Sequence, residues 1–176
     1  MMYPGRNRGA CLPIFGVMFI AFFLLARCKP RETKMSFETI EQNEYIESSG
    51  YSGDEIQLKI VSSTDEVNEL GTWVSEDSRS KIRELDFTSE FALAVFRGKM
   101  PSSGYKIEIV KVARQNTVVN LQIILLDPIP EIQKNDIETS PYHLVKIEKD
   151  GKWNEVITFN LINEGAQIQS LAHFIP

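Results

Sequence analysis

A chain of 176 residues is long enough for one domain with its own core and a further segment. Its 19 Lys and Arg are outnumbered by 24 Asp and Glu, which gives a net charge of −5, and every acidic residue follows Cys28. This acidic body argues against binding to nucleic-acid phosphates. The only cysteines are Cys11 and Cys28, so the chain beyond them cannot form a disulfide or a thiolate metal site.

Residues 1–28 have the pattern of a targeting segment. Arg6 and Arg8 precede an uncharged apolar run at residues 12–26. That run is shorter than the roughly 20 residues that span a bilayer comfortably, and a basic stretch followed by such a run is typical of an export signal.

Cys28 ends the sequence LARC, which resembles the lipobox of bacterial lipoproteins, where the signal is cleaved before a cysteine that becomes lipid-modified. Cys28 is therefore the predicted lipidation site. Positive charges follow the run, beginning at Arg27 and Lys29, and they favour an uncleaved signal-anchor as the alternative. Both interpretations place the protein at a membrane of the bacterial cell envelope, and we expect it to face away from the cytoplasm.

Residues 29–55 are polar, with several Ser, Gly and acidic residues and few large apolar ones. This composition predicts a tether between the membrane and a folded domain. The folded domain is expected at residues 56–176.

That domain is expected to begin with a strand followed by a helix. Residues 56–61 alternate apolar and polar side chains, as a half-buried strand does. Ser63 and Glu66 have the spacing of a capping box, and apolar residues then recur at helical intervals. Gly71 weakens the helix, so it is expected to end early or to resume toward Ile82.

Short strands follow in close succession at residues 91–96, 105–112, 118–126 and 144–147. The alternation breaks at Ile109 and Val110, which predicts a β-bulge. Asp150-Gly151 predicts a hairpin into the next strand. The expected fold class is α+β and β-rich: an antiparallel meander, forming a sandwich or a partly closed barrel, with one N-terminal strand-helix unit.

The segment from Gly98 to Gly104 contains two glycines, a proline and two serines. It lacks the Gly-Lys-Ser or Gly-Lys-Thr of a phosphate-binding loop, and a strand pattern follows it where such a loop leads into a helix. We interpret it as a connection between strands, with Gly98, Gly104 and Tyr105 shaping the loop.

Two stretches, DFTSEFALAVFRGKMPSSGYKIEIVKV at residues 86–112 and SPYHLVKIEK at residues 140–149, carry a family resemblance. They resemble the C-terminal domain of the PrcB family of bacterial secreted or lipid-anchored proteins, over about residues 85–149. The family takes its name from an accessory subunit of a bacterial surface protease complex. The resemblance implies a non-catalytic protein that binds and stabilises a protease.

No catalytic or metal-binding constellation is evident, so we expect neither an enzyme nor a cofactor. Ser140 and His143 are close in sequence, but proximity does not supply the third group that orients a catalytic base. Tyr142 and His143 are interpreted as a pair that packs at the edge of the sheet. Acidic residues cluster in the stretch DPIPEIQKNDIETSP, but their spacing matches no calcium loop, and a solvated loop explains them.

In an up-and-down sheet alternate connections emerge at the same end, so the loops at residues 98–104 and 128–141 should lie together. Proline-bearing loops on a rigid sheet are common recognition sites. The predicted partner-binding residues are Met100, Pro101, Ile129, Pro130, Ile132 and Tyr142. Three functions stay open: an envelope module accessory to a protease, a protease inhibitor, and a structural lipoprotein without an enzyme partner.

Overall fold

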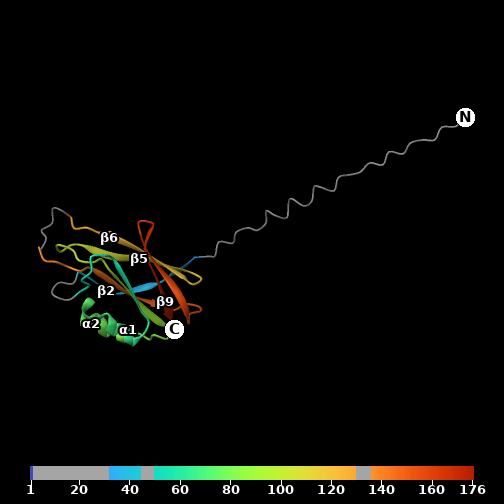
Figure 1. Ribbon diagram of the computed structural model, residues 1–176. Coiled ribbons are helices and arrows are strands. Elements are labelled where there is room, and N and C mark those ends of the chain that lie inside the picture. The colour runs from blue at the N-terminus through green and yellow to red at the C-terminus, as the bar shows by residue number, and fades with distance from the viewer. Residues whose placement is uncertain (2–31, 45–49, 130–135) are drawn as a thin grey trace. The chain divides into compact units, whose positions relative to one another are not determined.

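The computed structural model describes residue 1 and residues 32–44, 50–129 and 136–176 (Figure 1). Residues Glu32–Pro176 form one compact unit. The predicted signal and Cys28 lie outside the described residues. Of the helices that are described, none has the length and apolar character needed to cross a membrane.

Two facing sheets make up the body of the domain. The five-stranded sheet contains, in spatial order, β1 (Thr33–Met35), β5 (Lys106–Gln115), β6 (Val118–Leu126), β8 (Glu155–Asn163) and β9 (Ala166–Ile175). The four-stranded sheet contains β2 (Phe37–Asn43), β7 (Tyr142–Glu148), β4 (Glu90–Phe96) and β3 (Gln57–Val61). The sheets do not close into a barrel, so the β-rich class is confirmed in its sandwich form.

The main core lies between the two sheets. Alternate residues of β6, such as Val119, Leu121 and Ile123, are buried there, and Phe159 of β8 and Phe91 of β4 meet across the gap with ring centroids 6.0 Å apart. Burial of these apolar side chains is the main stabilising contribution to the sandwich.

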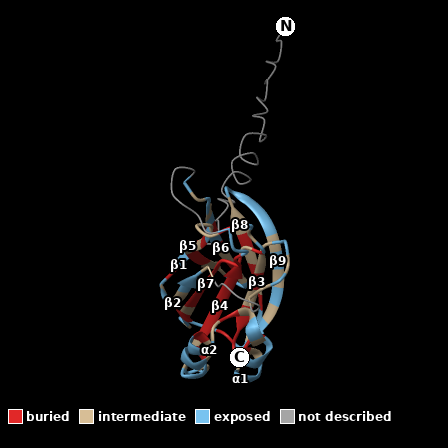
Figure 2. Ribbon diagram, turned by 90° about the vertical axis from the view of Figure 1, so that its left-hand side faces the viewer, coloured by how far each residue is buried: buried red, intermediate tan, exposed pale blue. Residues whose placement is uncertain are grey.

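The second face of the four-stranded sheet is covered by three short helical segments (Figure 2). They are α1 (Thr64–Glu69), the 3₁₀ turn η1 (Gly71–Trp73) and α2 (Glu76–Arg83). β4 is buried at every position from Phe91 to Phe96, because one row faces the other sheet while the alternate row packs under the helices. A continuous apolar strand is the pattern of a sheet covered on both sides.

The predicted strand-helix unit is confirmed. Ser63 is the N-cap of α1, and its Oγ accepts a hydrogen bond from the Glu66 N–H. The Glu66 carboxylate reaches back one residue further than a capping box requires, to the Ser62 N–H at 2.6 Å. The helix stops before Gly71, whose φ is 50°, and α2 begins after the new N-cap Ser75.

The connections between strands differ from those of a single meander. Consecutive strands from β4 to β8 change sheet at three of their four connections, and β6 pairs with β8 in parallel. Asp150-Gly151 therefore does not form the predicted hairpin, because β7 and β8 lie in different sheets. Asn154, with a φ of 69°, and the buried Trp153 lengthen this connection and direct the chain across the sandwich. The predicted β-bulge is confirmed, since the β5–β6 register shifts between Ile109 and Lys111.

The tether expected at residues 29–55 is wrong for residues 33–43. β1 pairs with β5, and after the single residue Ser36 the chain enters the other sheet, where β2 pairs with β7. These strands are polar because they lie at sheet edges, where one strand face and one backbone edge remain exposed.

Candidate partner-binding surface

The two predicted loops meet at one end of the sandwich, which we call the loop end. Met100 and Thr139 exchange both backbone hydrogen bonds, each at 2.9 Å. The Thr139 hydroxyl also donates to the carbonyl of Ser102 at 3.0 Å. Each loop crosses from one sheet to the other at this end of the sandwich. The predicted juxtaposition is present, although it arises from sheet crossing and not from a meander.

A third segment, residues 50–56, locks the first loop from its other side. The Lys99 N–H donates to the carbonyl of Gly53 at 2.9 Å, and the Ser140 hydroxyl donates to the carbonyl of Tyr51 at 2.8 Å. Gly98 has a φ of 96°, and a Cβ there would lie 2.9 Å from the Asp54 backbone. The loop end is therefore made of three segments held by backbone hydrogen bonds.

Gly104 and Tyr105 lie beneath the first loop. Gly104 has a φ of 94°, and a Cβ at this position would lie 2.7 Å from the Cβ of Pro128 in the second loop. The Tyr105 ring packs under the guanidinium of Arg97, 4.9 Å from its centroid. At this point the two loops approach too closely for any residue other than glycine.

Arg97 organises the loop end, and nothing in the sequence singled it out. Its guanidinium donates to the carbonyls of Lys106 at 3.0 Å and Leu126 at 2.7 Å, and it pairs with the Asp127 carboxylate. It thus ties the beginning of β5 to the end of β6. A lone arginine carries no sequence signal for this role, because its partners are backbone carbonyls of other strands.

Glu44 is a second residue that sequence reasoning missed. Its carboxylate accepts a hydrogen bond from the Gly104 N–H at 2.8 Å, and its carbonyl accepts one from the Ser140 N–H at 2.9 Å. Glu44 follows β2, so the segment expected to be a tether instead connects the two loops.

The predicted contact residues divide into three groups. Pro101 is exposed, Met100 is half-buried, and Ile129 retains 57% of its accessible surface. Pro130 and Ile132 lie outside the described residues. Tyr142 is fully buried and cannot touch a partner, so that prediction is wrong.

Tyr142 is buried because β7 is an inner strand and its outward face lies under the helices. Its ring packs near that of Phe96, with centroids 5.9 Å apart. Burial, with the nearby Glu41 carboxylate, raises the pKa of the Tyr142 hydroxyl to about 12.

Further apolar side chains extend the exposed surface. Ile124 and Leu126 lie on the uncovered face of β6, the latter 43% exposed, and Ile137 is exposed in the second loop. The sequence signal was present, since residues 123–126 are apolar on both faces of a strand. We call Ile124, Leu126, Ile129 and Pro101 the apolar strip.

The family comparison covers both of these loops. Residues 91–148 match the family model described as PrcB C-terminal. This segment is similar to PrcB C-terminal domains. It runs from β4 to the end of β7, close to the range expected from the sequence. No curated protein and no solved structure matches the chain.

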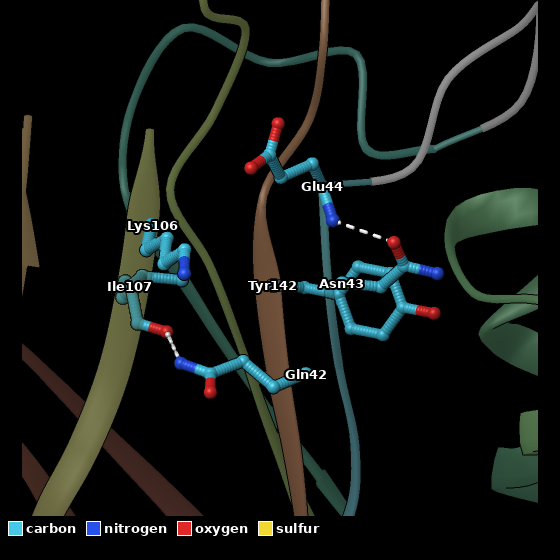
Figure 3. A pocket seen from close by; sticks show the side chains of 6 residues that line it. All are labelled: Gln42, Asn43, Glu44, Lys106, Ile107 and Tyr142. Carbon is cyan, nitrogen blue, oxygen red and sulfur yellow. Dashed lines mark hydrogen bonds between the residues drawn. The ribbon is translucent and has the colours of Figure 1, made fainter. Parts of the chain in front are cut away.

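Beside the loops, the domain has a hollow of about 320 Å³ between the end of β2 and the beginning of β5 (Figure 3). Gln42 closes its lower part by donating to the carbonyl of Ile107 at 3.1 Å. Asn43, Glu44 and Lys106 give the mouth a polar, mixed-charge lining. Tyr142 borders the hollow, but its ring points toward the helices and has no exposed surface.

His143 is a buried link between the sheets. It lies on the inner strand β7, so the predicted position at the edge of the sheet is wrong. Its Nδ1 accepts a hydrogen bond from the Ile109 N–H at 2.9 Å, and its Nε2 lies 2.9 Å from the Thr39 hydroxyl. The ring must therefore be neutral, with the proton on Nε2. Burial lowers the pKa of His143 to about 4.

The other residues considered for chemistry have separate partners. Ser140 donates to Tyr51, away from the hydrogen bonds of His143. In the acidic loop Asp127 pairs with Arg97, and Glu138 pairs with Lys99 at 3.0 Å. Within the described residues, no three His, Cys, Asp or Glu side chains are grouped so that they could hold a metal ion.

Proposed function

We propose that this chain is a non-catalytic protein of the bacterial envelope that binds a protein partner through its loop end. We further propose that the partner is a protease, which the domain stabilises as an accessory subunit. Anchoring is assigned to the N-terminal segment through Cys28 or an uncleaved signal-anchor. The match to the PrcB C-terminal family supports the protease assignment.

One observation carries the proposal: apolar side chains are exposed on a part of the molecule that is held rigid. Ile129 follows Pro128, which lies directly against Gly104 of the first loop, and Thr139 near the end of the same loop exchanges two backbone hydrogen bonds with Met100. Apolar side chains on a preorganised surface lose little conformational freedom on docking, so more of their burial appears as affinity.

The strip continues from the loop onto a strand, which gives the surface a defined geometry. Leu126 and Ile124 project from the same face of β6 and precede Ile129 along the chain. The carbonyl of Leu126 is held by Arg97, and this fixes the point where strand becomes loop. A partner would meet the exposed Ile124 and Leu126 beside the charged residues Glu108 and Lys106, which are their register partners on β5.

The experiment is capture of partners from detergent-solubilised membranes with the tagged full chain. The Leu126→Ser/Ile129→Ser double variant should recover at least about 10-fold less partner than the parent chain, because buried apolar anchors dominate interface energies. Val156→Ser is the matched control. Val156 is 58% exposed, on the same sheet but away from the strip, and its substitution should leave capture unchanged.

Protease activity in the captured material decides what the partner is and how it responds. Activity that is recovered with the parent chain and outlasts that of the free protease supports an accessory subunit. Activity that falls when the chain is added back indicates an inhibitor. Equal capture by the parent and the double variant would exclude the strip as the binding surface.

A further inference from the structure

Among the strands that the structure describes, β9 is an edge strand with one unpaired side, and it lacks the protection that edge strands usually carry. It lies at the end of the five-stranded sheet and spans ten residues, from Ala166 to Ile175 (Figures 1 and 2). Its sequence AQIQSLAHFI contains no Asp, Glu, Lys, Arg or Pro. Natural proteins generally block such edges with charge, proline or short length, because free backbone groups recruit another strand.

The direction of the backbone groups on β8 follows from one hydrogen bond. The Thr158 N–H donates to the carbonyl of Thr117 at 2.8 Å, at the start of the parallel pairing with β6. In a strand, successive residues direct their N–H and C=O groups to opposite sides. Phe159, the next residue, therefore directs its backbone groups toward β9.

The same alternation identifies the free groups of β9. Leu171 is the register partner of Phe159, so its backbone groups point to β8. Ser170 and Ala172, on either side of Leu171, therefore direct their N–H and C=O groups to the open edge. Neither carries a side chain large enough to obstruct an approaching strand.

The side chains on the uncovered face of β9 have a symmetric order. Along the strand they are Ile168, Ser170, Ala172 and Phe174, and all four are exposed. In either direction from Leu171, this row has first a small side chain and then a large apolar one. Ile168 is 45% exposed and Phe174 is 51% exposed.

We propose that β9 pairs antiparallel with β9 of a second copy of this chain, about a two-fold axis at Leu171. This register makes Ser170 and Ala172 of the two copies hydrogen-bonded pairs. It also places each Ile168 opposite the Phe174 of the second copy, which buries both exposed side chains as cross-strand pairs. The register of β8 with β9 shifts at Ile168, which sets one limit of the pairing.

The inner face of β9 is held by side-chain contacts, so the open edge has one fixed position. The Gln169 side chain accepts a hydrogen bond from the Leu58 N–H of β3 at 2.8 Å. His173 lies 3.0 Å from the Ser62 hydroxyl and 3.2 Å from the Glu66 carboxylate. These contacts protect the edge of β3 but leave the edge of β9 unoccupied among the residues described. Isologous pairing of one exposed edge produces a closed dimer, not a filament.

Disulfide cross-linking of the full chain in detergent tests the register. In the proposed dimer the two Leu171 residues form a non-hydrogen-bonded pair, with Cα atoms about 4.5 Å apart, within the range of a disulfide. Leu171→Cys should therefore cross-link two copies on oxidation, above the background of the parent chain with Cys11 and Cys28. Ser170→Cys is the control, because its counterpart is Ala172 and not another cysteine. If Leu171→Cys does not fold, the exposed double variant Ser170→Cys/Ala172→Cys should cross-link instead.

Sedimentation of the same protein tests the edge independently. The parent chain should have twice the protein mass of a monomer, and Ala172→Lys should reduce it to one, because a charge at the centre of the pairing is buried. Gln122→Lys, which adds the same charge to the exposed face of β6, should leave the dimer intact. A monomeric parent chain, or a dimer that survives Ala172→Lys and lacks the Leu171→Cys cross-link, overturns the proposal. Neither result bears on partner capture by the apolar strip.

Discussion

The two ends of the sandwich are each held by one arginine stacked on an aromatic ring, yet they are built for different purposes. At the loop end Arg97 lies over Tyr105 and caps the carbonyls of Lys106 and Leu126. At the other end, the turn end, Arg114 lies 4.0 Å above the ring of Trp153. Both arginines are nearly buried, with 10% and 14% of their side chains exposed.

The difference between the ends is in what surrounds each arginine. Arg114 donates to the carbonyls of Asn116 and Lys152 and pairs with Glu155, so it closes two short turns upon a buried ring. Arg97 instead supports loops that leave apolar side chains in solvent. Similar chemistry thus stabilises the core at one end and presents a surface at the other.

The largest expected effect comes from adding a methyl group where the loop segments touch. Gly98→Ala should lower the free energy of unfolding by about 3 kcal/mol, because the positive φ and the clash with the Asp54 backbone act together. Gly151→Ala at the turn end should cost only about 1 kcal/mol, because its φ is also positive but its Cβ would meet open space. Chemical denaturation measures both. Equal losses would show that the loop segments are not tightly packed.

The next effect is a pH dependence from His143. The pKa of this buried ring is about 4 against an ordinary histidine value of 6.5, so between these values the unfolded chain binds more protons than the folded one. Stability is then complete above about pH 6.5 and falls by about 3 kcal/mol as the pH drops toward 4. Denaturation at a series of pH values measures this loss. His143→Gln, which cannot titrate, should flatten the curve between pH 6.5 and 4.5, and an unchanged slope would assign it to other groups.

Truncation of the two arginines compares the ends directly. Arg114→Ala should cost about 2 kcal/mol, because it removes a close cation–π contact and leaves Glu155 partly buried without its partner. Arg97→Ala should cost about 1 kcal/mol, since Asp127 is well exposed and can be solvated. Thermal unfolding gives the order of the two losses. The reverse order would make the loop end the more important for stability.

The smallest effect on stability is expected at the surface itself. Ile129→Ser should change the unfolding free energy by less than about 0.5 kcal/mol, because the side chain has few contacts to lose. A melting curve that matches the parent protein would confirm that this residue is free for binding. A drop comparable to that of Gly98→Ala would instead mean that Ile129 is part of the loop packing.

The sequence predicted the strands that alternate and the helix that is capped, because these patterns are local. β3, β5, β6 and α1 were all expected near their observed positions. β1 and β2 were missed, because edge strands need few apolar residues and their pairing partners lie far along the chain. The sequence also did not predict that β7 and β8 lie in different sheets, because their pairing partners too are distant along the chain.

Among the predicted surface residues, Ile129 and Pro101 could be identified from the composition of their loops. The same composition could not show that Tyr142 is not part of the surface. In the sequence, an aromatic residue beside a loop gives the same pattern whether its side chain is exposed to solvent or covered by a helix. The run FALAVF carried the missing information, since apolar residues at every position indicate a sheet covered on both faces. Arg97 and Glu44 were beyond reach, because their roles depend on backbone groups of other strands.

The switch of sheet at Ser36 has a mechanical consequence. Tension that enters the domain at Glu32 would first load the three residue pairs between β1 and β5, which are few enough to part at low force. Beyond Ser36 the strand belongs to the opposite sheet and is paired along its length with β7, the strand that carries His143. Peeling cannot then simply continue along one sheet edge. Because of this crossing, β1 can detach under force while β2 stays paired, and the sandwich and its exposed loops keep their shape.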